Sequence, residues 1–191
     1  TNAITSDFTV GGGAITQAGP GILTLSGVNT YKVGTFFNAG ILNASADYNL
    51  GSASASLTFN GGTLQFGASF NLASTRAITL NAGGGTFNTD PATTLTLGGA
   101  ITGTGSLTKS GTGTLTLTGA NTYQGTTTIS AGTLALGGSA SIASSSQVNV
   151  SNAAGKLGLR RDQWAAGDDY VHAYLENNTR SFNGGAPFKT A

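Results

Sequence analysis

The chain has 191 residues and a net charge of +1, and only 8% of its residues are charged, against roughly 25% in ordinary soluble domains. A hydrophobic content of 38% with almost no net charge excludes an intrinsically disordered chain. The same balance gives no electrostatic basis for binding nucleic acid or an anionic membrane, and no apolar run approaches the ~20 residues that span a bilayer.

The N-terminus and the cysteine count both bear on where the protein works. The chain contains no cysteine, which favours an exported, extracellular product over a cytosolic one. It starts at Thr1 with neither an initiator methionine nor a basic-then-apolar leader. We therefore expect Thr1 to be a processed or excised start.

Short runs of alternating apolar and polar residues follow one another to about residue 150. In chain order they include Leu23-Thr24-Leu25, Leu57-Thr58-Phe59, Leu64-Gln65-Phe66, Ile78-Thr79-Leu80, Leu95-Thr96-Leu97, Leu115-Thr116-Leu117, Leu134-Ala135-Leu136 and Val148-Asn149-Val150. A period of two predicts strands with one buried face. Glycine pairs and triplets between the runs predict sharp corners. Very short strands without a helical pattern indicate a β-solenoid or a sandwich.

An internal repeat decides between these two folds. Residues 11–43 and 103–135 share 16 identities in 33 gap-free positions. A solenoid stacks equivalent residues on successive coils, whereas a sandwich needs no self-similarity, so the repeat favours a parallel solenoid. The 92-residue offset predicts four coils of about 23 residues or five of about 18. The residues expected to point inward are Leu23, Leu25, Leu57, Phe59, Leu95, Leu97, Leu115 and Leu117.

Both copies of the repeat also contain an Asn-Thr-Tyr triplet after a glycine corner. We expect the amides of Asn29 and Asn121 to hydrogen-bond the corner backbone. Tyr31 and Tyr123 come just beyond that corner. A lid over the edge of the core is favoured for both rings, with a ligand platform as the alternative.

The repeat resembles a known family. The string GTGSLTKSGTGTLTLTGANTYQGTTTISAGTL (Gly103–Leu134) is similar to the autotransporter-associated β-strand repeat of bacterial secreted passenger domains, and so is the degenerate copy at Gly11–Leu42. The resemblance covers about residues 11–150. It implies an all-β, right-handed parallel β-helix displayed or released outside a bacterial cell. No translocator domain follows, so we expect a passenger fragment or a stand-alone protein built from the same repeat.

The composition changes near Lys156, which predicts a solenoid over residues 1–155 and a distinct segment over 156–191. Nine of the 15 charged side chains and the single Trp164 lie in this last segment. Residues 160–178 have helical spacing. Because an open solenoid end exposes an unpaired ladder, the segment is expected to cap that end or to dock onto another molecule.

Sites for chemistry are sparse in this sequence. Asp168, His172 and Glu176 would align on a helix, but they span ~12 Å, which is too far for one ion, so a solvated face is favoured. Only five charged residues lie between Phe8 and Gly155. We therefore predict no catalytic, cofactor-binding or metal-binding residues, and no enzyme activity.

The sequence thus predicts a non-catalytic extracellular structural or adhesive scaffold, with a glycan-binding or glycan-cleaving β-helix as the alternative. Self-association, glycans or other surfaces are the partners that a neutral Thr/Ser/Asn exterior suits. We further expect head-to-tail assembly into fibres, with residues 1–16 meeting residues 156–191. A monomer whose tail folds back as a cap is the alternative.

Overall fold

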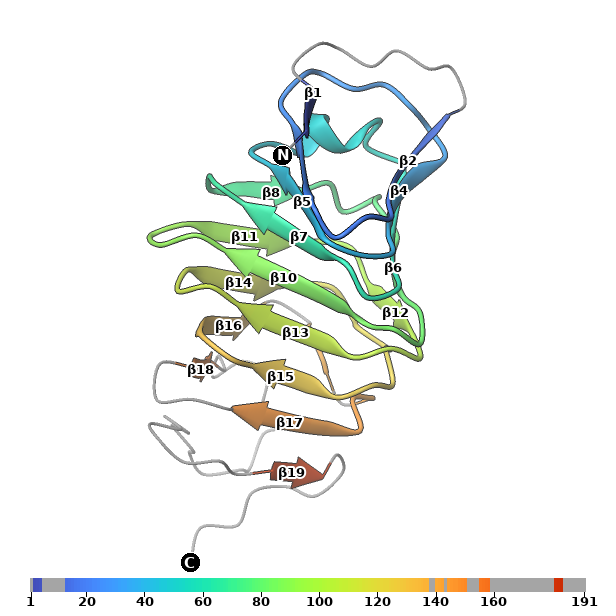
Figure 1. Ribbon diagram of the computed structural model, residues 1–191. Coiled ribbons are helices and arrows are strands. Elements are labelled where there is room, and N and C mark those ends of the chain that lie inside the picture. The colour runs from blue at the N-terminus through green and yellow to red at the C-terminus, as the bar shows by residue number, and fades with distance from the viewer. Residues whose placement is uncertain are drawn as a thin grey trace, which may run out of the picture.

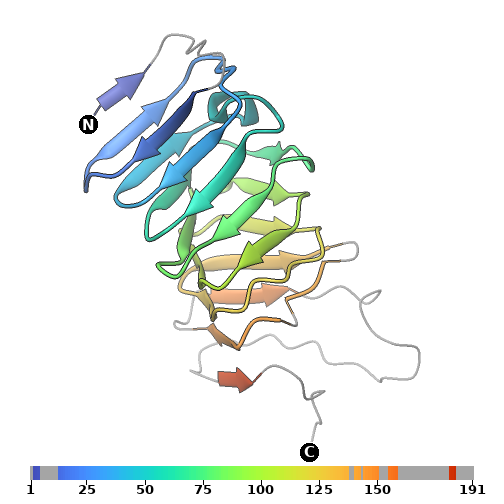
Figure 2. The ribbon, with the colours of Figure 1, turned by 90° about the vertical axis from the view of Figure 1, so that its right-hand side faces the viewer.

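The computed structural model describes the backbone of residues 2–4, 13–137, 140–142, 144–150, 155–158 and 181–183. This part of the chain winds into an elongated parallel β-solenoid, as the sequence predicted (Figures 1 and 2). A complete coil passes through sheet A, then sheet C, then sheet B. Sheet A gains a strand in every coil, whereas some coils have a corner or a turn in place of a strand on sheet B or sheet C. The strands therefore lie across the long axis of the molecule, and each sheet extends along it.

The three sheets are built from short strands. Sheet A contains β1 (Asn2–Ile4), β3 (Ile22–Leu25), β5 (Ile41–Ala44), β7 (Thr63–Phe66), β10 (Gly85–Thr89), β13 (Leu107–Ser110), β15 (Thr127–Ile129), β17 (Gln147–Val150) and β19 (Ser181–Asn183). Sheet B contains β2 (Ala14–Gln17), β4 (Gly34–Phe37), β6 (Ser56–Phe59), β9 (Ile78–Leu80) and β12 (Ile101–Gly103). Sheet C contains β8 (Phe70–Leu72), β11 (Thr94–Leu97), β14 (Thr114–Leu117), β16 (Gly132–Leu136) and β18 (Gly155–Gly158). All strand pairings among the described residues are parallel except that of β17 with β19, which is antiparallel.

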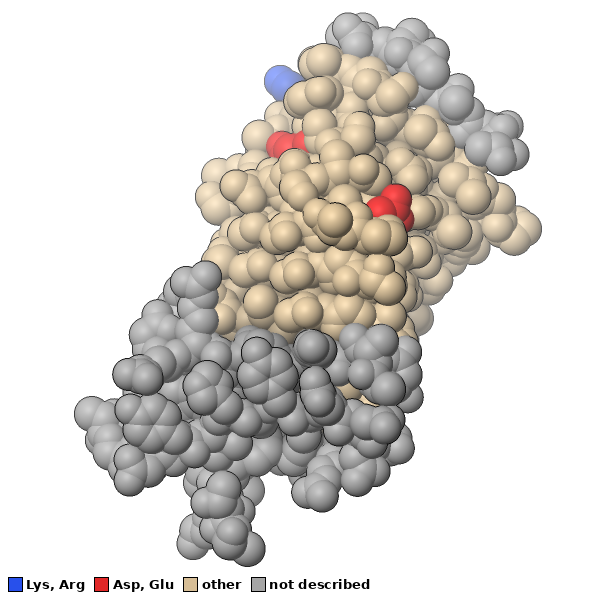
Figure 3. Space-filling view, turned by 90° about the vertical axis from the view of Figure 1, so that its left-hand side faces the viewer, with Lys and Arg blue, Asp and Glu red and all other residues tan. Residues whose placement is uncertain are grey.

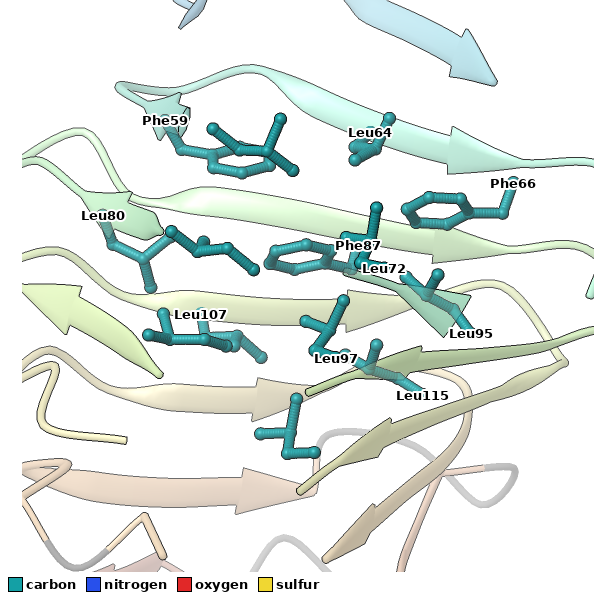
Figure 4. Close-up of a cluster of buried hydrophobic side chains, with 14 of the residues drawn as sticks. Phe59, Leu64, Phe66, Leu72, Leu80, Phe87, Leu95, Leu97, Leu107 and Leu115 are labelled. Carbon is teal, nitrogen blue, oxygen red and sulfur yellow. The ribbon is translucent and has the colours of Figure 1, made fainter. Parts of the chain in front are cut away.

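The core is a stack of inward side chains contributed by every second residue of each strand (Figure 4). Phe37 and Phe59 stack with ring centroids 4.2 Å apart, and Phe87 continues the row at 4.9 Å from Phe59. A single coil is too thin to enclose these rings, so each coil is stabilised by its neighbours. Seven of the eight predicted inward residues are buried, while Leu23 is only partly buried.

Glycine recurs in the repeat because the coils approach closely at the corners. Gly40 and Gly132 occupy equivalent positions, and both have positive φ, at 61° and 63°. A Cβ atom on either would clash with backbone oxygens of the preceding coil. Only glycine combines this backbone conformation with this clearance.

The spacing of the coils corrects one prediction. Register steps along sheet A measure 19 to 23 residues, and the four steps from Leu23 to Lys109 span 86 residues, six short of the 92-residue offset. Those six residues take the chain from one sheet to the next, which is one of the three sides of the coil. The offset is therefore four coils plus one side, and neither four nor five whole coils.

The two copies consequently lie on different sheets. In the first copy β2, β3, β4 and β5 belong to sheets B, A, B and A, whereas the equivalent β13, β14, β15 and β16 belong to sheets A, C, A and C. The glycine–Asn-Thr-Tyr corner takes the sheet C side in the first copy and the sheet B side in the second. Each repeat is the same module, turned by one side of the solenoid.

The C-terminal predictions fall largely outside the described residues. The expected helix over 160–178 and the boundary at residues 155–156 remain predictions. The described β18 and β19 pair with β16 and β17, so both extend solenoid sheets.

Candidate binding surface

The recurring aromatic residues of the repeat lie inside the solenoid. Tyr31 and Tyr123 are fully buried, and their hydroxyls lie 2.7 Å from the Oγ1 atoms of Thr35 and Thr127. Neither ring is therefore a lid over the core edge, as was favoured, nor a ligand platform. Burial raises the pKa of the Tyr123 hydroxyl to about 12, and it raises the pKa of Tyr31 as well.

The corner asparagines are internal too, and their predicted role is confirmed. The Asn121 Oδ1 atom accepts a hydrogen bond from the Ile101 N–H at 3.0 Å, and its Nδ2 donates to the carbonyls of Gly119 and Ser141. In the first copy, Asn29 Nδ2 donates to the Asn49 carbonyl at 2.6 Å. Each amide thus replaces strand pairing where the corner interrupts a sheet.

A buried lysine, which the sequence analysis did not single out, supports a corner of the second copy. Lys109 occupies an inward position of β13, in register between Phe87 and Ile129. Its Nζ donates to the carbonyls of Ser110, Gly111 and Ala131 at 2.7, 2.7 and 3.2 Å. Burial lowers the pKa of this ammonium from 10.5 to about 8.

The equivalent position in the first copy performs the same task without a charge. Gln17 aligns with Lys109, and its Nε2 donates to the carbonyls of Gly19 and Gly21 at 3.0 and 2.9 Å. A lysine within an otherwise alternating Leu-Thr-Lys-Ser run was the sequence signal for this internal corner support.

One ion pair holds the irregular element of the solenoid. The 3₁₀ turn η1 (Asp47–Leu50) fills the sheet C side of the second described coil, before that sheet begins at β8. The fully buried Arg76 guanidinium binds both carboxylate oxygens of Asp47 at 3.0 Å. It also donates to the carbonyls of Leu50 and Ala55 at 2.9 and 2.8 Å. This fork fixes η1 against the next coil.

The outward faces carry ladders of threonine. On sheet A, Thr63, Thr86, Thr108 and Thr128 lie in register on adjacent strands, as do Thr58 and Thr79 on sheet B. Sheet C has two adjacent rows, formed by Thr94, Thr114 and Thr133 and by Thr96 and Thr116. Adjacent rungs of such ladders are ~4.8 Å apart. The exterior therefore offers regularly spaced hydroxyl and methyl groups.

Charge on the described surface is scarce, as the largely tan surface in Figure 3 shows. Arg76 and Lys109 are fully buried, so among the described side chains the exposed charge is left to Lys32, Asp47 and Asp90. Asp47 is bound to Arg76, and Asp90 Oδ1 accepts a hydrogen bond from Gln65 at 2.9 Å.

Within the described ranges, no three His, Cys, Asp or Glu side chains are grouped so as to hold a metal ion. The sequence-predicted alignment of Asp168, His172 and Glu176 lies outside those ranges. No helix among the described residues is long and apolar enough to cross a membrane.

Comparison with known proteins shows what the repeat is similar to. The family model described as passenger-associated-transport-repeat matches residues 15–44 and 107–136, which coincide with the two copies of the module. An 83-residue stretch, 44% of this chain, is 45% identical to a protein named adhesin BmaC autotransporter from Brucella suis biovar 1 (strain 1330). The aligned stretch covers 2% of that relative's length. No solved structure matches this chain.

Proposed function

We propose that this chain, a β-solenoid built on two passenger-associated-transport repeats, is a non-catalytic adhesive scaffold. The match to the passenger-associated-transport repeat and to a relative named as an autotransporter adhesin supports a surface-exposed or extracellular location for the chain. One observation carries the proposal. Every recurring polar or aromatic side chain of the repeat that makes a described contact supports a corner or the core, so the repeat supplies length and rigidity.

A scaffold of this kind leaves adhesion to the outward ladders. Because the same module faces different sides in its two copies, its recurring residues do not define one shared binding face. The outward threonine rows present the same uncharged groups on all three sheets. Contacts with this neutral surface would depend little on salt.

The non-catalytic part of the proposal is supported by what the described carboxylates already do. Asp47 is engaged by Arg76 and by the Ala73 N–H, and Asp90 is bound by Gln65. General acid–base cleavage of a glycan needs two carboxyl groups flanking one bond. These two acids are committed to separate structural contacts.

The test of the scaffold proposal is direct. Beads coated with the purified chain should adhere to epithelial cells or to an abiotic surface more than beads coated with an unrelated β-protein of similar size. Assays on a panel of polysaccharides should show no turnover. Adhesion equal to the control, or hydrolysis of any polysaccharide, would contradict the proposal.

Head-to-tail assembly into fibres is a finer proposal about the same scaffold. The low charge leaves little repulsion between ends. The alternative is that the C-terminal segment caps the solenoid. The antiparallel pairing of β19 with β17 at the end of sheet A favours this alternative. Negative-stain imaging of the chain with and without residues 156–191 separates the two: fibres support assembly, and single particles in both samples at high concentration exclude it.

A further inference from the structure

The N-terminal end of the sheet C side carries an aromatic residue on a rigid support. Tyr48 lies in η1 and is 54% exposed, the highest exposure of any large hydrophobic side chain in the described part of the chain. Val28, 50% exposed, lies one coil earlier, where the neighbouring Asn29 N–H donates to the Tyr48 carbonyl at 2.9 Å. The buried Arg76 holds η1 through its ion pair with the partly exposed Asp47. The backbone that carries the ring is therefore held in place.

A polar track continues from this aromatic residue along the same side of the molecule. Asp47 accepts a hydrogen bond from the Ala73 N–H just after β8, so η1 and β8 are neighbours (Figures 1 and 2). The exposed Asn71 of β8 is in register with Thr96, and Thr96 is in register with Thr116. The parallel row of Thr94, Thr114 and Thr133 lies beside it. None of these five threonine hydroxyls donates or accepts a hydrogen bond within the described residues.

Sheet C differs from the other faces in the residues that lie beside its threonines. On sheet A the row beside the threonines contains Gln65 and Asn88, and Gln65 is bound to Asp90. On sheet B the ladder includes Phe36, in register with Thr58. Among the described faces, only the sheet C side combines two adjacent threonine rows with an exposed tyrosine in the preceding coil. We call the set of Val28, Tyr48, Asn71, Thr94, Thr96, Thr114, Thr116 and Thr133 the tyrosine–threonine track.

The chemistry of the tyrosine–threonine track limits what it can bind. Its members are uncharged, so it has no counter-charge for an acidic polymer such as a nucleic acid or a sulfated glycan. Its two half-exposed apolar side chains, on the order of 200 Å² together, fall far short of the ~800 Å² that each partner buries in a stable protein–protein interface. A tyrosine ring has an apolar face wide enough for one sugar ring, and hydroxyl and amide groups in line suit a chain of hydroxyls.

We propose that the tyrosine–threonine track binds a neutral polysaccharide chain along the solenoid axis, with one sugar ring stacked on Tyr48 and the hydroxyls of following sugars bonded to the threonine rows. The inference deepens the adhesive function proposed above and rests on it. A few neutral contacts give weak binding by one copy, which many copies on one surface would raise by avidity.

The test uses the full chain in biolayer interferometry against immobilised mannan, galactan and laminarin, which are neutral, and hyaluronan and heparin, which are acidic. Binding to at least one neutral polysaccharide is expected, with the same affinity at low and high salt. Tyr48→Ala should weaken it about tenfold, the effect of losing one stacked ring. The double variant Thr96→Ala/Thr116→Ala should weaken it several-fold.

A matched control exists on another face. Thr58 and Thr79 are also in register, outward and partly exposed, but they belong to sheet B. Thr58→Ala/Thr79→Ala should therefore leave binding unchanged, and all variants should melt at the same temperature as the parent. Equal losses from the sheet B and sheet C variants, or binding confined to the acidic polymers at low salt, would overturn the inference. If coated beads adhere but no polysaccharide binds, this inference fails while the scaffold proposal stands. If the beads do not adhere and no polysaccharide binds, both proposals fail.

Discussion

The two copies of the repeat solve the same corner with different surroundings. In the first copy, the corner at Tyr31 is hydrogen-bonded to the η1 region of the next coil, and that region is held in turn by the charged fork of Arg76. In the second copy, the corner at Tyr123 is followed by Ser145, whose Oγ lies 2.9 Å from the Thr127 Oγ1. The shared residues thus define the corner itself. What lies next to it, and which sheet it faces, comes from residues outside the repeat.

The largest expected effect separates the two copies. Arg76→Ala leaves Asp47 partly buried without its counter-charge and removes the donors to several buried carbonyls, so it should cost about 3–5 kcal/mol of unfolding free energy. Hydrogen exchange should accelerate over residues 27–55 and change little over residues 119–137. Arg76→Lys, which keeps the charge but not the fork, should lie between. Uniform loss of protection in both copies would show that the fork is not local to the first.

The corner amides should be equally important in both copies. Asn29→Ala and Asn121→Ala each leave buried backbone groups unpaired, so each should cost about 2 kcal/mol in urea unfolding. Thr30→Ala and Thr122→Ala, which change the exposed neighbours, are the controls and should be nearly neutral. A large cost in one copy with none in the other would mean that the module is not the unit of stability.

Lys109 and Gln17 make the comparison sensitive to pH. Because the unfolded chain holds the Lys109 proton up to about pH 10.5 while the folded chain releases it near pH 8, stability should rise between these values, by on the order of 1–3 kcal/mol. Above pH 10 the buried Tyr123, with its pKa near 12, reverses the sign, because the unfolded chain ionises first.

Thermal melts from pH 7 to 11 should therefore show a maximum near pH 10. Lys109→Gln installs the residue of the first copy and should remove the rise between pH 8 and 10. A rise that persists in this variant would have to come from another group.

The smallest effect concerns two threonines at inward positions. The Thr89 Oγ1 is buried and has no hydrogen-bond partner among the described residues, so Thr89→Val should stabilise the fold by about 1 kcal/mol. Thr127→Val removes a hydroxyl that is bonded to both Tyr123 and Ser145, so it should destabilise by about 1–2 kcal/mol. Shifts of the same sign in urea midpoint would contradict this difference.

The alternation of leucine and threonine was enough to predict the sheets, because a period of two leaves one buried face whichever sheet a strand joins. It could not predict the sheet. Coil length varies with each corner, so a few residues more or less move Leu115 from one side to the next. The pairing of Asp47 with Arg76 was also out of reach, since the two are 29 residues apart and no local pattern links them.

The tyrosines show a signal that was present but not used. Tyrosine followed four residues later by threonine occurs at the same place in both copies, as Tyr31 with Thr35 and as Tyr123 with Thr127. The threonine hydroxyl gives the tyrosine hydroxyl a hydrogen-bond partner inside the core, so the ring can be completely buried. A tyrosine at the edge of the core could bond to water and would not need this partner. The outward track could be predicted only in part, because Tyr48 depends on η1, whose exposure the sequence does not reveal.

The one-side rotation between the copies has a consequence for how such chains lengthen. A duplicated segment need not contain a whole number of coils, since the module closes its corner on sheet C or on sheet B with the same contacts. Insertions and deletions that shift a copy by one side would therefore preserve the core while changing which outward residues share a face. For an engineer, the solenoid can be extended in steps of a third of a turn, and the display pattern can be chosen separately from the length.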